Sequence, residues 1–131
     1  MTCIKLVIPE IPPSNNEYMG RGSRHYQSFT YQEEKTKWEW LVRAATKKKP
    51  RKPIEKAVVN ITYYFPDKRR RDPDNYSGKF LLDGLTKAGI IKDDSFSNIN
   101  LVLAGRVDRE NPRTEIMVRE VKGESSGKED D

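Results

Sequence analysis

Residues 68–94 read KRRRDPDNYSGKFLLDGLTKAGIIKDD, and this stretch decides how the rest of the chain is interpreted. It opens with four consecutive cations at 68–71, and two carboxylates separated by one proline follow at 72–74. A helical pattern then runs to Gly89, and a second acidic pair follows at 93–94. Cations bind phosphate, and clustered carboxylates hold divalent metal. Their proximity indicates metal-dependent phosphodiester chemistry on a nucleic acid.

The first two carboxylates are spaced to act together. Pro73 fixes its own φ and holds Asp72 in extended geometry, and residues i and i+2 of an extended segment point the same way. Asp72 and Asp74 can therefore aim at one point, where their like charges are unfavourable without a cation between them. Oxygen ligands without soft partners favour Mg²⁺ or Mn²⁺. Asp93 and Asp94 can fold back along the helix to close such a site.

A purely structural interpretation of these residues stays open. The DPDN motif at 72–75 can merely cap a helix, and the acidic pair at 93–94 can be a polar loop. Lys79 and Asp83 are four residues apart, so they can form a surface ion pair of about 0.3–0.5 kcal/mol. Alternatively, Lys79 faces the site and steadies the charge on the phosphate. The adjoining cations favour the functional interpretation, because a phosphate-binding segment and a carboxylate site are then contiguous.

Outside this stretch, alternation of apolar residues marks the strands. They are predicted at residues 4–8, 56–65 and 99–107, the last with Ile99, Leu101, Leu103 and Val107 on one face, and around Ile116 and Val118. The strand at 56–65 is largely apolar or aromatic on both faces, which indicates a central position in the sheet. Residues 9–27 have no period and are predicted to form a long loop. Its polar side chains suit backbone and phosphate contacts: Asn15, Asn16, Arg21 and Arg24.

Two helices complete the pattern. The first is predicted to begin at a capping box formed by Thr30 and Glu33 and to end before Pro50. The second is predicted over residues 75–88, capped by residue 74 or 75, with Gly89 just after its end. Their buried faces are Trp38, Leu41, Val42 and Ala45 on the first helix, and Leu81, Leu82, Leu85 and Ala88 on the second. The order β-α-β-α-β-β predicts an α+β, two-layer sandwich of about four strands with two helices on one face.

Composition sets the class of protein. The 131 residues fit one domain, predicted at 1–122, followed by an acidic tail at 123–131 that is expected to be disordered. No apolar run approaches ~20 residues, and a single cysteine rules out an intramolecular disulfide, so a cytoplasmic protein is expected. The apolar content of 34% is lean, which favours oligomerisation. Trp40 lies off the buried stripe of its helix; partial burial is expected, with base stacking or a subunit interface as alternatives.

The net charge of +5 is unevenly distributed. Residues 43–71 hold eleven Lys or Arg against two acids. A concentrated basic segment is typical of a protein that binds a polyanion. For the lysines at 47–49 a solvated helix end is the alternative.

The motifs together resemble the RusA-type Holliday-junction resolvases, a family of crossover junction endodeoxyribonucleases. The matching pieces are RRRDPDN at 69–75, Lys79, LLDGLTKAG at 81–89, the acidic pair at 93–94, and PPSNN at 12–16. The resemblance covers roughly residues 4–121. It implies a homodimeric endonuclease that uses Mg²⁺ or Mn²⁺ to nick four-way DNA junctions in recombination and repair. Such genes are frequent in bacteriophages and prophages.

The resemblance also assigns roles to residues. The three essential aspartates of the family fall on Asp72, Asp74 and Asp94, with Asp93 a further candidate ligand, and the essential lysine falls on Lys79. The mechanism implied is metal-assisted hydrolysis by a water attacking in line. The DNA backbone would be held by the cations Lys68, Arg69, Arg70 and Arg71.

One departure from the family pattern affects Lys79. Three residues separate Asn75 from Lys79, where the best-known members have two. An extra residue turns a helical side chain by about 100°, and Gly78 near the helix start can absorb that change. Three other functions stay open: a non-catalytic nucleic-acid-binding protein, a structural protein of a nucleoprotein assembly, and a nuclease for other branched DNA.

Overall fold

The computed structural model of the chain describes residues 2–15 and 24–121, except for the side chains of 24–30. The expected disorder of 123–131 lies outside this range. The sheet has four strands, β1 (Cys3–Ile8), β2 (Ala57–Phe65), β3 (Ile99–Val107) and β4 (Arg113–Glu120), in the order β1-β4-β2-β3. β4 is antiparallel to both of its neighbours, and β2 and β3 run parallel. The mixed sheet confirms the predicted fold class and the central position of β2.

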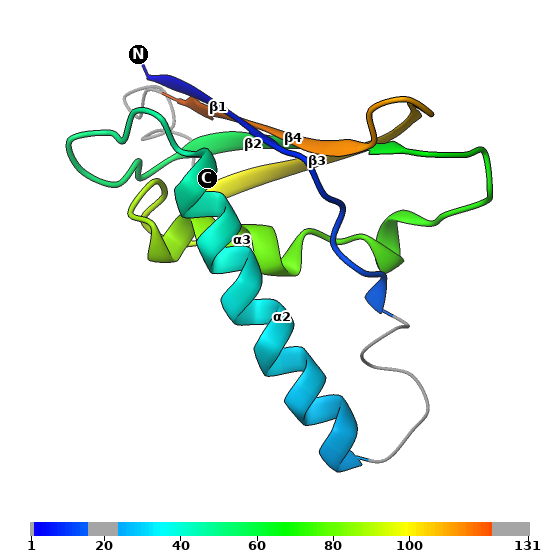
Figure 1. Cartoon of the computed structure of the whole chain (residues 1–131). Helices are drawn as coiled ribbons and strands as arrows, with labels where there is room; N and C mark the ends of the chain where they lie inside the picture. The colour runs from blue at the N-terminus through cyan, green and yellow to red at the C-terminus, as the bar shows by residue number, and fades with distance from the viewer. Residues whose placement is uncertain (1, 16–23, 122–131) are drawn as a thin grey trace.

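Two helices, α2 (Arg24–Ala45) and α3 (Lys79–Lys87), lie on the same side of the sheet (Figure 1). α3 forms the crossover between the parallel strands β2 and β3, as parallel pairing requires. A short 3₁₀ helix, η1 (Pro73–Asn75), precedes it. The connection after β2 therefore carries the first acidic pair, and the connection before β3 carries the second.

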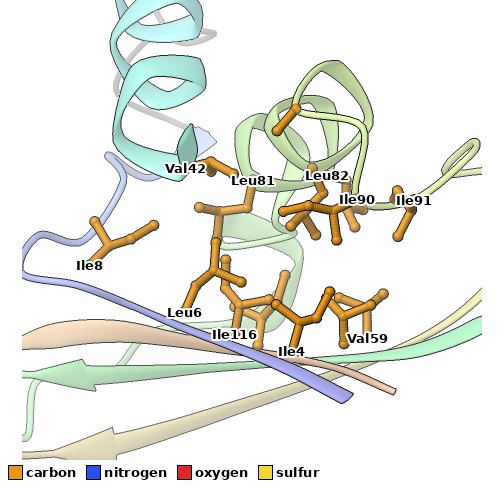
Figure 2. Packing of buried hydrophobic residues seen from close by; sticks show 14 of the residues in the cluster. Ile4, Leu6, Ile8, Val42, Val59, Leu81, Leu82, Ile90, Ile91 and Ile116 are labelled. Atoms are coloured by element: carbon orange, nitrogen blue, oxygen red, sulfur yellow. The ribbon is translucent and has the colours of Figure 1, made fainter. Parts of the chain in front are cut away.

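The core lies between the two layers, and Figure 2 shows how it is built. Alternate residues of the strands point toward the helices, among them Leu6, Val59 and Ile116, which are fully buried. Val42 of α2 and Leu81 of α3 close the other side. The predicted helix stripes are confirmed: Trp38, Val42, Leu81, Leu82, Leu85 and Ala88 are buried, and Leu41 and Ala45 pack against the core.

The helix boundaries differ from the prediction. α2 begins at Arg24 and not at the Thr30 capping box, because no glycine or proline after Gly22 interrupts propagation toward the N-terminus. α3 begins at Lys79, with Gly78 as its cap and no side-chain cap bond. The expected start near residue 75 is wrong because Gly78 adopts a left-handed φ of 83°, which ends any helical run from η1.

The predicted partial burial of Trp40 is wrong, and β3 is covered less than its apolar face would allow. Trp40 is 71% exposed, because it lies two residues from the buried Trp38 and two residues are about 200° of helical rotation. On β3 only Ile99 is buried. Leu101 and Val107 are 38% and 43% exposed, because β3 is an edge strand whose inward face the two helices cover only in part.

Within the part of the chain that the structure describes, neither helix combines the length and apolar character needed to cross a membrane.

Candidate active site

The turn after β2 is organised by Asp67. Its carboxylate accepts hydrogen bonds from the backbone N–H of Arg69 at 3.0 Å and from the guanidinium of Arg71 at 2.9 Å. These bonds, the backbone one first, hold the pKa of Asp67 below its ordinary 3.8. Arg71 also donates to the carbonyls of Asp67 and Arg69 and lies 4.4 Å from the ring centroid of Phe65. The cationic run is thus folded onto the end of β2.

The four cations of this run do not share one role. The Arg71 side chain is only 15% exposed and its Nη1 contacts Asp67 and Arg69 within the turn, so it positions the backbone that leads into Asp72. Lys68, Arg69 and Arg70 are exposed. Arg70 Nε lies 3.1 Å from Asp72 Oδ1, and the Asp72 side chain is 46% exposed. An arginine that already contacts the carboxylate is placed to exchange it for a phosphate oxygen.

The first acidic pair lies in η1 and its cap. Asp72 is extended, with φ −107° and ψ 143°, as Pro73 predicts. The chain then turns, since the N–H of Asn75 donates to the Asp72 carbonyl at 2.9 Å. The expectation of an extended segment therefore holds for Asp72 and fails for Asp74. Asp74 is exposed, and its carbonyl accepts a hydrogen bond from Asn15 Nδ2 at 2.8 Å.

Asn15 was expected to contact phosphate, and here it anchors the acidic turn to the segment after β1. The PPSNN motif contained that residue, but nothing in the pattern indicated its partner. Of the other loop residues, Asn16 and Arg21 lie outside the described residues, and so does the side chain of Arg24.

An aromatic cluster supports the turn from below, which the sequence patterns did not indicate. The rings of Tyr63, Phe65 and Tyr76 contact one another with centroids 5.1–5.8 Å apart. An open pocket lies between these rings, Asp72, Arg71 and the middle of β3. The acidic turn therefore rests on packed side chains of β2, and its carboxylates face solvent.

Lys79 opens α3, directly after the left-handed Gly78. Gly78 adopts a φ of 83°, and whether this conformation compensates for the extra residue between Asn75 and Lys79 stays a prediction. Lys79 Nζ lies 5.6 Å from the ring centroid of Tyr31 on α2. Among the described residues it forms no ion pair with Asp83, so the surface-pair interpretation loses its support.

The second acidic pair lies at the other end of α3 (Figure 1). Asp93 and Asp94 are exposed in the connection before β3. The bridge between Ile54 and Ile91 holds the start of that connection, and Asn98 Nδ2 donates to the Glu55 carbonyl at 2.8 Å at its end. α3 has nine residues and is about 13 Å long. Within one chain Asp72 and Asp74 lie in the same turn before α3, and Asp94 lies beyond the other end of α3.

This separation has a direct consequence for metal binding. Across residues 2–15 and 24–121, no three His, Cys, Asp or Glu side chains are grouped closely enough to hold a metal ion. The two carboxylates at the end of β2 still fit Mg²⁺, which proteins commonly bind through one or two carboxylates together with substrate phosphate.

The fold and this turn define a small α+β protein with exposed carboxylates and cations at the end of a β-α-β unit. A family model described as endodeoxyribonuclease RusA matches residues 9–119. The chain therefore belongs to the RusA endodeoxyribonuclease family. Membership implies an endonuclease that acts on Holliday junctions, and nucleases of this family generally depend on a divalent metal. No curated protein matches the sequence significantly.

Proposed function

We propose that this chain is a cytoplasmic, homodimeric, metal-dependent endonuclease that resolves four-way DNA junctions by paired symmetric nicks. It would act in recombination and repair or in the processing of phage DNA. The observation that carries the proposal is the acidic turn of Asp72 and Asp74, contiguous with exposed cations, in a chain of the RusA family. A protein that only binds nucleic acid has no need for exposed carboxylates facing phosphate.

The residues of the turn have separable roles in this proposal. Asp72 and Asp74 would hold Mg²⁺, or Mn²⁺ in its place, and Asp94 with its neighbour Asp93 would complete the ligand set. When bound, the metal supplies polarisation of the scissile phosphate and a water of lowered pKa. Lys79 would steady the negative charge that develops on the phosphate.

The cations beside the acidic turn would hold the DNA backbone. Lys68, Arg69 and Arg70 are exposed and can bind phosphates in a sequence-independent way. Arg71 supports them from below through its contacts with Asp67 and Phe65.

The position of Asp94 makes the dimer part of the proposal. The bridge and hydrogen bonds around residues 91–98 hold Asp94 at the far end of α3 from Asp72. Rebuilding this connection within one subunit would break those contacts. A second copy related by two-fold symmetry can instead present its Asp94 to the Asp72–Asp74 turn of the first. Two such sites form at once, one for each of the opposed nicks.

The first test of this function is cleavage by single variants. Asp74→Asn should abolish nicking of a four-way junction in Mg²⁺, yet leave junction binding in EDTA unchanged or slightly tighter, because it removes negative charge near phosphate. Glu33→Gln, an exposed carboxylate on α2, is the matched control and should cut normally. Full activity of Asp74→Asn would refute the assignment of the metal site.

The second test asks which subunit supplies Asp94. Asp74→Asn and Asp94→Asn homodimers should each be inactive, whereas mixed dimers of the two contain one intact site if Asp94 comes from the partner. Mixing should therefore restore single-strand nicking. If the sites lie within single subunits, every site in the mixture carries a substitution and no activity returns.

A further inference from the structure

The connection between α2 and β2 carries a second basic segment, which the proposed active site does not use. Residues 47–52 read KKKPRK, five cations in six residues without an acid, and all five are exposed. In the part of the chain that the structure describes, none of them forms an ion pair. Like charges packed within the Debye length of about 8 Å repel one another. Such a segment is expected where a polyanion neutralises it.

This segment has a defined place in the fold. Pro50 and Pro53 restrict its backbone, and Ile54 at its end is bridged to Ile91. The N–H of Ile54 donates to the Ile90 carbonyl at 2.9 Å, and the N–H of Lys92 donates to the Ile54 carbonyl at 2.9 Å. The end of the segment is thereby held beside the connection that carries Asp93 and Asp94, at one end of the sheet (Figure 1).

Stabilisation of helix ends accounts for only part of this charge. Cations near a helix C-terminus interact favourably with its dipole. Arg43 already fills that role by donating to the Lys87 carbonyl at 3.1 Å, and the Lys49 side chain reaches Gly89 just past the end of α3. Lys47, Arg51 and Lys52 form no hydrogen bond or ion pair that is seen among the described residues, and they line two open depressions.

We infer that residues 47–52 form a second contact surface for the DNA backbone, separate from the cations at 68–71. The inference rests on the proposed nuclease function, and it names the surface of the protein that would hold a duplex arm of the junction. The bound chemistry is a row of phosphate diesters, because exposed lysines beside open depressions select charge and not base sequence. If Asp94 acts in the partner's site, this segment lies beside the same scissile strand.

The two basic surfaces are separated by a distance that suits duplex DNA. They lie at opposite ends of β2, whose nine residues span roughly 27 Å at ~3.3 Å per residue. One turn of B-DNA is about 34 Å long. One subunit can therefore contact phosphates of an arm about a helical turn apart, and each basic surface has an acidic pair beside it.

Salt-dependent binding tests the inference. The triple variant Lys47→Ala/Arg51→Ala/Lys52→Ala removes three cations that have no described contacts, so it should fold like the wild type. Binding of a fluorescent four-way junction in EDTA is measured by anisotropy between 50 and 300 mM NaCl. Each lost phosphate contact should flatten the log–log slope by roughly 0.9, which gives a change of about 2 to 3 for the triple variant. The matched control is Arg106→Ala/Arg109→Ala/Arg119→Ala, which removes the same charge from exposed positions on β3, β4 and the turn between them.

The outcomes separate this inference from the function on which it rests. A flatter slope for the segment variant, with the control near wild type, supports the second surface. A slope equal to wild type, or equal flattening in both variants, overturns it while wild-type cleavage of junctions still stands. Failure of the wild type to bind or cut branched DNA would instead remove the proposed function. Hydroxyl-radical footprints should show that the segment variant and Arg69→Ala/Arg70→Ala lose protection at different phosphates; loss at the same phosphates overturns the inference.

Discussion

Gly78 allows the chain to pass from the acidic turn into α3, and Gly78→Ala should show what that passage requires. Its φ of 83° is left-handed, which costs a residue with a Cβ about 1–2 kcal/mol. A Cβ at this position would also lie 2.8 Å from Ile61 Cδ1, in the core under the sheet. Overpacking of this kind costs a further ~1–3 kcal/mol. The free energy of unfolding should therefore fall by about 2–5 kcal/mol.

Urea unfolding of two further variants isolates the steric part. Gly89 has nearly the same φ, 80°, but the nearest atom to an added Cβ is Lys49 Nζ at 3.6 Å. Gly89→Ala should thus cost the backbone strain alone, about 1–2 kcal/mol. Ile61→Val removes the clashing methyl group; it should cost ~0.5–1.5 kcal/mol by itself and less in the Gly78→Ala background. Equal losses for Gly78→Ala and Gly89→Ala, with no coupling to Ile61, would refute this reasoning.

Two more predictions concern the frame of the site. Gly84→Ala would place a Cβ 2.8 Å from Val42 Cγ2, between α3 and α2. The cost of overpacking should exceed the gain of ~1 kcal/mol in helix propensity, so the free energy of unfolding in urea should fall by about 1–2 kcal/mol. Val42→Ala in the same chain should reduce this loss. Asp67→Asn should destabilise the protein at neutral pH by removing bonds from Arg69 and Arg71. Because the folded pKa of Asp67 is lowered, its contribution is present above the unfolded value near 3.9 and is lost as pH falls through the folded pKa. The stability gap between wild type and Asp67→Asn should thus narrow below about pH 4, and a gap independent of pH would contradict the assigned role.

Side-chain periodicity predicted the layers of this fold because burial acts on every second or every third to fourth residue. The alternation in β1 and β2 and the stripe of Trp38 and Val42 are both buried as expected. Boundaries were less predictable, since they depend on single residues. Thr30 fits a capping box by its local sequence, yet the helix continues past it to Arg24.

Within the site, the sequence predicted which residue types are present, but it did not predict which residues they contact. The extended Asp72 follows from Pro73 alone, a local effect. The bond from Asn15 to the Asp74 carbonyl joins residues 59 positions apart, and no pattern encodes it. Arg71 reads as one more phosphate contact in its run of cations. The one local signal for the different role of Arg71 was Asp67, which lies two residues before Arg69 and four before Arg71 and can bond to both in a turn.

The separation of the two acidic pairs follows from strand direction. β2 and β3 are parallel, with Ala57 opposite Ile99 and Phe65 opposite Val107. In a parallel pair the end of the first strand and the start of the second lie at opposite ends of the sheet. Residues 72–74 follow β2 and residues 93–94 precede β3, so their separation is a property of the topology. The contacts of Ile91 with Ile54 and of Asn98 with Glu55 hold this connection in place, which supports the proposal made above that a second copy of the chain supplies Asp94.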